Sequence, residues 1–131
     1  MDVVWLGDSD DFPPADQTTA DGVVAVGGRP TPERLLAAYQ NGIFPWPHEG
    51  FPLLWFCPDP RFVLTPATMH LPRSLRKVLR QERFEITVDK AFVPTMCSCA
   101  GVPRLGQAGT WITDEMIAGY AALHDVGLAH S

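Results

Sequence analysis

The chain has 131 residues, of which 46% are hydrophobic and 19% are charged, an ordinary mixture for one compact globular domain. This composition excludes a disordered tail and a coiled coil. The net charge of −5 argues at first sight against a polyanionic partner, but five of the ten basic residues lie between Arg73 and Arg83. The local charge therefore predicts partners better than the net charge does.

The composition also bears on location and on metal binding. No apolar stretch approaches the ~20 residues of a membrane span, and the acidic start lacks the features of a signal peptide, so we expect a cytoplasmic protein without a membrane partner. Three cysteines fit a reducing compartment. The isolated pair Cys97 and Cys99 is better interpreted as partly buried thiols than as half of a zinc site, which needs four ligands. We predict no metal site.

The first predicted elements are two short strands and a helix. Residues 3–6 and 23–26 are apolar runs typical of short strands, the first of them an edge strand. Thr31 is a plausible N-cap and Pro32 suits the first helical position, which predicts a helix over residues 32–41. Nine of the thirteen prolines lie between positions 30 and 72, so much of that region must be extended or turned backbone.

A boundary is expected near Arg61, followed by a short strand over residues 62–64. A helix is predicted from position 72 to about position 81, and residues 84–88 alternate apolar and polar side chains as in a half-buried strand. The predicted helix places four apolar side chains on its buried side: Leu71, Leu75, Val78 and Leu79.

The last predicted elements are two helices and the start of a strand. Asp89 is expected to cap a helix that begins at Lys90, and Thr113 to cap the next helix, which has an acidic first turn. Residues 128–131 begin a strand without a following partner, which indicates truncation. We therefore expect the apolar faces of residues 84–88 and of the helix after Thr113 to be unusually exposed.

Two groups of side chains are candidates for binding. Basic residues recur at spacings of three and four, at Arg73, Arg76 or Lys77, Arg80 and Arg83, and share one helical face. This face is either a solvated surface or a phosphate contact, and the sequence alone favours the solvated surface. Trp46 and Trp111 each follow a turn or loop rather than lying on a periodic face, so a flat or apolar ligand is expected there.

The remaining aromatic residues are interpreted more conservatively. Trp5, Phe51 and Trp55 are expected to be core wedges, whereas Tyr39 and Tyr120 lie on apolar stripes and fit packing and a site equally well. The chain has neither a phosphate-binding glycine pattern nor a Gly-x-Ser-x-Gly elbow, which disfavours ATP or a dinucleotide as a ligand and also disfavours serine-hydrolase chemistry.

Ordered blocks of this sequence resemble leucyl/phenylalanyl-tRNA-protein transferase, a bacterial enzyme that adds Leu or Phe to protein N-termini. The blocks are Gly22–Gly28, Arg34–Tyr39, Gly42–Trp46, Leu53–Arg61, His70–Lys77, Gly109–Thr113 and Tyr120–Ser131. The resemblance implies an α+β fold with a small N-terminal α+β domain at residues 1–61. Residues 62–131 would then be the truncated start of an acyltransferase-like (GNAT-like) α/β domain.

The resemblance also implies partners and site residues. The donor would be aminoacyl-tRNA carrying Leu or Phe, and the acceptor a protein with an N-terminal Arg or Lys that is thereby tagged for degradation. The positions that match the family's tRNA-binding cluster are Arg73, Lys77 and Arg80. The positions that match its substrate-binding aromatic residues are Trp46, Trp111, Tyr39 and Tyr120.

The chemistry requires no cofactor, because an aminoacyl ester is already activated and an α-amine is partly free base near neutral pH. A catalyst must align the reactants, accept a proton and stabilise the oxyanion. In the family these groups follow the Ala-His-Ser block, so we expect the catalytic residues beyond Ser131 and the chain itself to be inactive. The alternatives are a catalytically dead RNA-binding remnant and a partially folded fragment. The sequence departs from the family at positions 29–31, which usually hold Asp-Leu-Ser.

Overall fold

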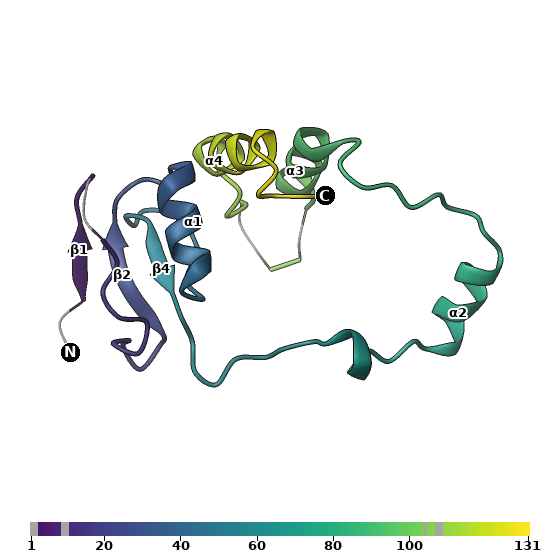
Figure 1. The fold of residues 1–131 in the computed structure, drawn as a ribbon, viewed down its shortest axis with the longest axis horizontal. Helices are drawn as coiled ribbons and strands as arrows, with labels where there is room; N and C mark the ends of the chain where they lie inside the picture. The colour runs from purple at the N-terminus through teal and green to yellow at the C-terminus, as the bar shows by residue number, and fades with distance from the viewer. Residues whose placement is uncertain (1–2, 9–10, 104, 107–108) are drawn as a thin grey trace.

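The computed structural model describes residues 3–8, 11–103, 105–106 and 109–131, and it contains a small mixed sheet with helices stacked on one side (Figure 1). The elements are β1 (Val4–Leu6), β2 (Val23–Gly27), α1 (Pro32–Gln40), β3 (Phe44–Pro45), β4 (Leu54–Phe56), the 3-10 helix η1 (Pro66–Thr68), α2 (Arg73–Arg80), α3 (Phe92–Gly101) and α4 (Asp114–Asp125). The predicted α+β class is confirmed. The acyltransferase-like architecture and the division near residue 61 stay predictions.

The sheet has the strand order β1-β2-β4-β3, with β1 parallel to β2 and β4 antiparallel to both its neighbours. Both predicted N-terminal strands are confirmed. Trp55 on β4 is fully buried, its indole Nε1 donates to the Gly27 carbonyl oxygen at 2.9 Å, and the ring of Phe12 meets it edge-on at 4.9 Å. The predicted core role of Trp55 is therefore confirmed.

The predicted core roles of Trp5 and Phe51 are wrong, since both side chains are 69% exposed. Trp5 lies on β1, the edge strand, where only Leu6 turns into the core. Phe51 lies outside the sheet, in the turn that joins β3 to β4. An aromatic residue next to a strand is thus not sufficient evidence of burial when the strand is short and at an edge.

The two capped helices form as predicted because their start signals are local. The Thr31 hydroxyl accepts from the Arg34 amide at the start of α1, and the Thr113 hydroxyl accepts from the Met116 amide at the start of α4, each at 3.3 Å. Helix α1 buries Leu35 against the sheet. Its predicted extent is confirmed to within one residue.

Helix α4 lies between α1 and α3 (Figure 1). Its Met116 and Leu123 side chains are buried, and Leu123 belongs to the same hydrophobic core as the sheet. A Cβ atom at Gly119 would overlap the Pro30 carbonyl oxygen, so glycine is what permits this close approach of α4. The expectation that the apolar face of this helix is exposed is therefore wrong, because α1 and α3 cover it.

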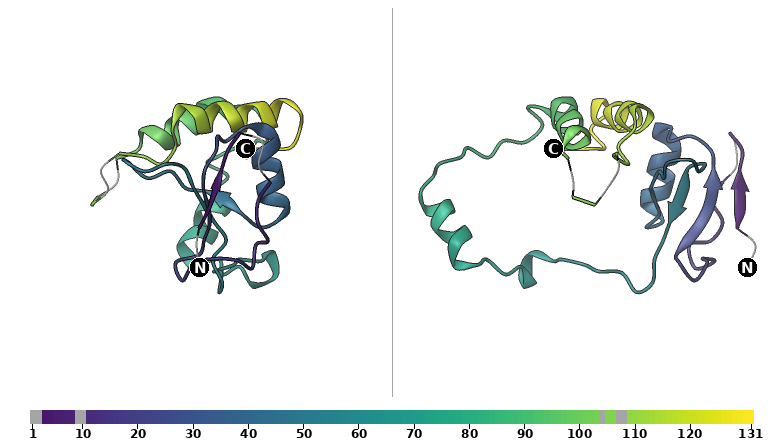
Figure 2. Two further views of the ribbon diagram at one scale, coloured as in Figure 1. Left: turned by 90° about the vertical axis from the view of Figure 1, so that its left-hand side faces the viewer. Right: turned by 180° about the vertical axis from the view of Figure 1, so that it is seen from behind.

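Residues 58–90, which we call the arm, leave the sheet, carry α2 away from the other elements and return to α3 (Figures 1 and 2). The strands predicted at residues 62–64 and 84–88 are wrong, because both segments are extended without a partner strand in the described part of the chain. Helix α2 is confirmed, but its predicted buried side is wrong, since Leu75 and Leu79 are exposed. The predicted exposure of the 84–88 face is confirmed.

Asp89 does not cap a helix, so that prediction is also wrong. Helix α3 begins at Phe92 after Ala91, with no side-chain cap. The Asp89 amide instead donates to the Ser131 carbonyl oxygen at 2.8 Å, and residues 128–131 form no strand.

None of the helices in the described ranges is long and apolar enough to cross a membrane.

Candidate functional site

Trp46 and Trp111 line the same cavity, which has a volume of about 580 Å³. Trp46 directly follows β3, and its amide donates to the Leu54 carbonyl oxygen at 2.8 Å, which extends the ladder with β4. Trp111 lies just before α4, on a turn held by the Ile112 amide, which donates to the Thr110 hydroxyl at 3.1 Å. The remaining lining residues are Pro47, His48, Glu49, Gly109, Thr110 and Thr113.

An aromatic cluster supports Trp46 from the sheet side. The Trp46 ring lies 6.2 Å from the rings of Phe44, His48 and Phe56, measured between centroids. The Arg61 guanidinium lies 5.5 Å from the centroid of the Phe44 ring and donates to the Gly42 carbonyl oxygen at 2.6 Å. Neighbouring rings and a short ladder therefore fix Trp46, so its indole is held in place before any ligand arrives.

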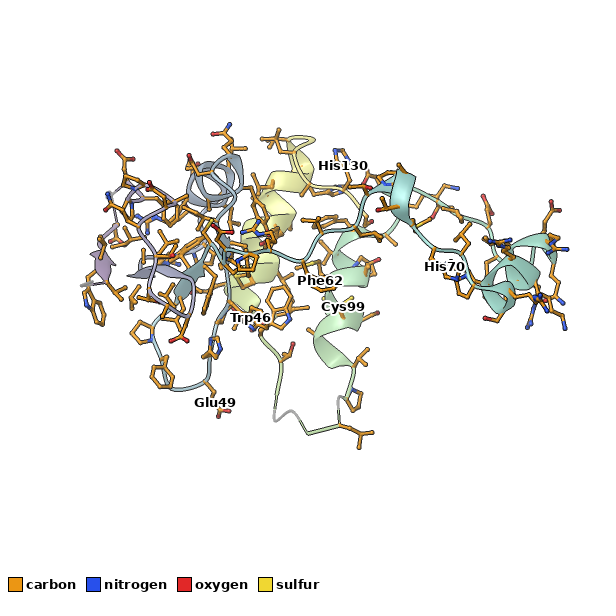
Figure 3. All side chains as sticks on the ribbon, turned by 90° about the horizontal axis from the view of Figure 1, so that it is seen from below. Trp46, Glu49, Phe62, His70, Cys99 and His130 are labelled. Atoms are coloured by element: carbon orange, nitrogen blue, oxygen red, sulfur yellow. The ribbon has the colours of Figure 1, made fainter. Side chains whose placement is uncertain are left out.

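The cavity is suited to a flat ligand. Its volume falls in the range of about 300–1,000 Å³ that is typical of small-molecule sites, and two indole rings contribute to its lining. The Glu49 carboxylate belongs to the same lining but stands at the outer end of the loop (Figure 3). Aromatic side chains of this kind stack on nucleobases without hydrogen-bond readout.

Tyr39 and Tyr120 contact each other at a different place. Their hydroxyl oxygens are 2.5 Å apart, and the rings meet edge-on with centroids 6.1 Å apart. Both line a second cavity, of about 310 Å³, with Leu36, Phe92, Met96, Leu123, Leu128, Ala129 and His130. Burial, and then the hydrogen bond to Tyr39, raise the pKa of Tyr120 well above its ordinary value, so its phenol stays neutral.

The basic residues of α2 share one face, as predicted. Arg73, Lys77 and Arg80 line a hollow of about 500 Å³ on the surface of this helix, together with Ser74 and Gln81. Within the described residues, none of the three cations forms an ion pair. The hollow shares no residue with either aromatic cavity, so the structure places the three groups of predicted residues at three separate locations.

A histidine–aspartate contact near the C-terminus was not predicted. The His130 Nδ1 atom lies 2.6 Å from Asp89 Oδ2, and the Ser131 amide donates to Asp89 Oδ1 at 3.0 Å. The hydrogen bond to Asp89 raises the pKa of His130, and the bonds from His130 and Ser131 lower the pKa of Asp89. His130 lies well apart from Trp46 (Figure 3). No local pattern could have identified this pair, because the partners are 41 residues apart.

Comparison with known proteins matches most of the chain to a single family. The model described as "Leucyl/phenylalanyl-tRNA protein transferase N-terminal domain" matches residues 28–59. The model described as "Leucyl/phenylalanyl-tRNA protein transferase" matches residues 63–131. The two matched ranges include both tryptophans of the cavity and the whole of α2.

Curated relatives carry the same name. A leucyl/phenylalanyl-tRNA–protein transferase of Myxococcus xanthus is 55% identical over 120 residues, which are 92% of this chain and 51% of the relative. Those of an Azoarcus species and of Magnetococcus marinus are 52% and 54% identical, over 98% and 92% of this chain and 55% and 50% of the relatives. The chain thus spans about half the length of the curated relatives it matches.

Proposed function

Because this chain belongs to the leucyl/phenylalanyl-tRNA protein transferase family, we propose that it binds aminoacyl-tRNA in the transfer of Leu or Phe to protein N-termini. The acceptor in this proposal is a cytoplasmic protein that begins with Arg or Lys and is tagged for degradation. The observation that carries the proposal is that Trp46 and Trp111, from two distant loops, line one cavity.

The Trp46–Trp111 cavity suits the terminal adenosine of the donor. Stacking of one base on an aromatic side chain contributes about 1–3 kcal/mol, and the supporting rings hold Trp46 in place beforehand. Tyr39 and Tyr120 are proposed as further substrate contacts, because both side chains line a cavity with mostly apolar walls. An apolar group of a substrate fits such a lining.

We propose that α2 contacts the phosphates of the acceptor stem through Arg73, Lys77 and Arg80. Each of the three side chains is exposed, and none is engaged with a carboxylate in the described part of the chain. A cationic face without counter-charges gains more from meeting phosphate than a paired face does. The same observation favours a second candidate, an RNA-binding protein without transfer activity.

We further propose that this chain alone transfers neither Leu nor Phe. Transfer needs a group that takes the proton of the attacking amine, and the carboxylates with defined contacts are engaged elsewhere. Asp89 is bound to His130 and to the Ser131 amide, and Glu115 is paired with Arg29 at 3.3 Å. Neither Asp89 nor Glu115 belongs to the lining of the Trp46–Trp111 cavity, and Glu49, which does, stands at the outer end of its loop (Figure 3).

The experiment that tests the donor site measures binding of a leucylated RNA minihelix ending in CCA to three tryptophan variants. Trp46→Ala and Trp111→Ala should each weaken binding by about 5- to 150-fold, the equivalent of one lost stacking contact. Trp5→Ala is the matched control, because Trp5 is exposed on the far edge strand and lines no part of the cavity. Equal effects of all three variants, or no effect of the first two, would refute the proposed site.

A further inference from the structure

Arg61 lies at the start of the arm and reaches back to the turn that leads into Trp46. Its guanidinium donates to the Gly42 carbonyl oxygen at 2.6 Å and to the Cys57 Sγ atom at 3.7 Å. The Arg61 side chain is exposed, so burial does not impose these contacts. Because ordering a long exposed side chain costs rotamer entropy, the contacts of Arg61 must outweigh that cost.

The same guanidinium also contacts the ring of Phe44. Its Cζ atom lies 5.5 Å from the ring centroid, within the distance of about 6 Å at which an aromatic face attracts a cation. The Phe44 ring lies 6.2 Å from the Trp46 ring and stacks on the Phe56 ring at 6.1 Å, measured between centroids. Arg61 is therefore connected to Trp46 through one intervening ring.

The contacts of Arg61 favour one of three roles. The cavity lining includes neither Arg61 nor Phe44, and the guanidinium is turned toward a backbone carbonyl and a ring, which disfavours a direct phosphate contact. No basic residue lies in the last turn of α1, and Gly42 follows that helix closely, so Arg61 also places a cation near its negative end. That role does not account for the contact with Phe44, which points toward the donor site.

We propose that Arg61 is a positioning residue of the donor site, which acts on Trp46 through Phe44 and the Gly42 turn. The inference rests on the proposed binding of aminoacyl-tRNA at the Trp46–Trp111 cavity. Trp46 is 45% exposed, so its indole needs lateral support to stay out of solvent. Because Arg61 holds the Phe44 ring, the indole keeps the orientation in which a base stacks on it, and less ordering remains to be done when the ligand binds.

Removing the guanidinium should weaken binding without removing a ligand contact. Arg61→Met keeps most of the apolar stem but loses the cation and the hydrogen-bond donor. We expect the indole to take the stacking orientation in about a tenth to a third of the molecules, which lowers the affinity about 3- to 10-fold. Arg61→Lys keeps a cation for the ring and a donor for the carbonyl, so it should bind more tightly than Arg61→Met.

The first test measures binding of a leucylated RNA minihelix ending in CCA to Arg61→Met, to Trp46→Ala and to the double variant. Because Arg61 acts through Trp46, Arg61→Met should cause no further loss once Trp46 is replaced. The salt slope should stay unchanged, whereas loss of a phosphate contact would reduce it by about 0.7 to 0.9. Arg29→Met is the matched control, because Arg29 pairs with Glu115 and lines neither aromatic cavity; it should change binding less than about twofold.

The second test needs no RNA. Fluorine NMR of the chain labelled with fluorotryptophan reports on each indole, and the variant Trp46→Phe identifies the resonance of Trp46. Arg61→Met should move or broaden the Trp46 resonance and leave that of Trp55 in place, because Trp55 is buried in the sheet core. A general loosening of the sheet would change both resonances. Arg29→Met should change neither.

Several results would overturn the inference. In the spectra these are an unchanged Trp46 resonance in Arg61→Met, or equal changes at Trp46 and Trp55. In the binding assay they are a reduced salt slope, losses that add in the double variant, or full affinity in Arg61→Met where Trp46→Ala binds weakly. If Trp46→Ala itself binds as the unaltered chain does, the donor site fails, and the fluorine spectra still decide whether Arg61 positions Trp46.

Discussion

Removing the three cations of α2 should change the salt dependence of RNA binding by a calculable amount. Each phosphate contact contributes about 0.7 to 0.9 to the slope of log affinity against log salt concentration. Because Arg73, Lys77 and Arg80 share one exposed face without ion pairs in the described chain, we count three contacts. Replacing all three by Ala should therefore reduce the slope by about 2 to 3.

The same arithmetic gives the loss of affinity that can be measured. Between about 50 and 200 mM salt, three phosphate contacts weaken the affinity for RNA by roughly 20- to 40-fold. The triple variant should lack this part of the salt dependence. The assay is fluorescence anisotropy of a labelled acceptor-stem duplex titrated at several salt concentrations. Because phosphate contacts carry no sequence information, duplexes of different sequence should respond alike.

A matched pair of lysines tests whether position rather than net charge matters. Lys77→Ala should lower the slope by nearly one unit. Lys90→Ala removes the same charge from a side chain that pairs with Glu85 at 3.7 Å, and it should leave the slope nearly unchanged. If both variants shift the slope equally, or if the triple variant keeps the original slope, the basic face of α2 is only a solvated surface.

Two further predictions concern stability and ionisation. Gly119→Ala should destabilise the fold by about 1–3 kcal/mol in urea unfolding, because the added Cβ meets a backbone carbonyl that cannot move aside. The control Gly101→Ala should not destabilise the fold, because no atom lies within 4 Å of the added Cβ. The contact between His130 and Asp89 stabilises the fold most between about pH 4 and pH 6.5, where the histidine is protonated and the aspartate is ionised. This stabilisation is lost as the pH rises through the raised pKa of His130, and it is lost as the pH falls through the lowered pKa of Asp89. Asp89→Asn should therefore lower the His130 pKa measured by NMR, and an unchanged value would refute the contact.

The parts of the fold that the sequence predicts correctly are those with local signals. Thr31 and Thr113 satisfy amides within their own helices, so their caps follow from nearby residues alone. The prediction for Trp55 is correct for a reason that is not local, since this residue lies on an inner strand with neighbours on both sides. The helical spacing of the α2 cations needs no tertiary information.

The errors over residues 84–88 and at Asp89 involve partners distant in sequence. The alternation over residues 84–88 describes a strand only if a second strand pairs with it, and none in the described chain does. Asp89 matches a helix cap locally but contacts His130 instead. At the site, the two tryptophans singled out for their irregular backbone line one cavity, and their role in binding stays a prediction. The separate location of the tyrosine pair depends on how α1 packs on α4, so the sequence could not predict it.

The most direct measurement of the central claim is a transfer assay with radiolabelled leucyl-tRNA and a peptide that begins with Arg. The chain is present at a concentration that keeps the leucyl-tRNA bound, without ATP or added metal, and the complete Myxococcus xanthus relative serves as the positive control. We predict that the chain retains leucyl-tRNA on a filter but moves no label to the peptide above the uncatalysed background. Label in the peptide above that background would mean that a catalytic group lies within these residues, and no retention would mean that the donor site has been misplaced.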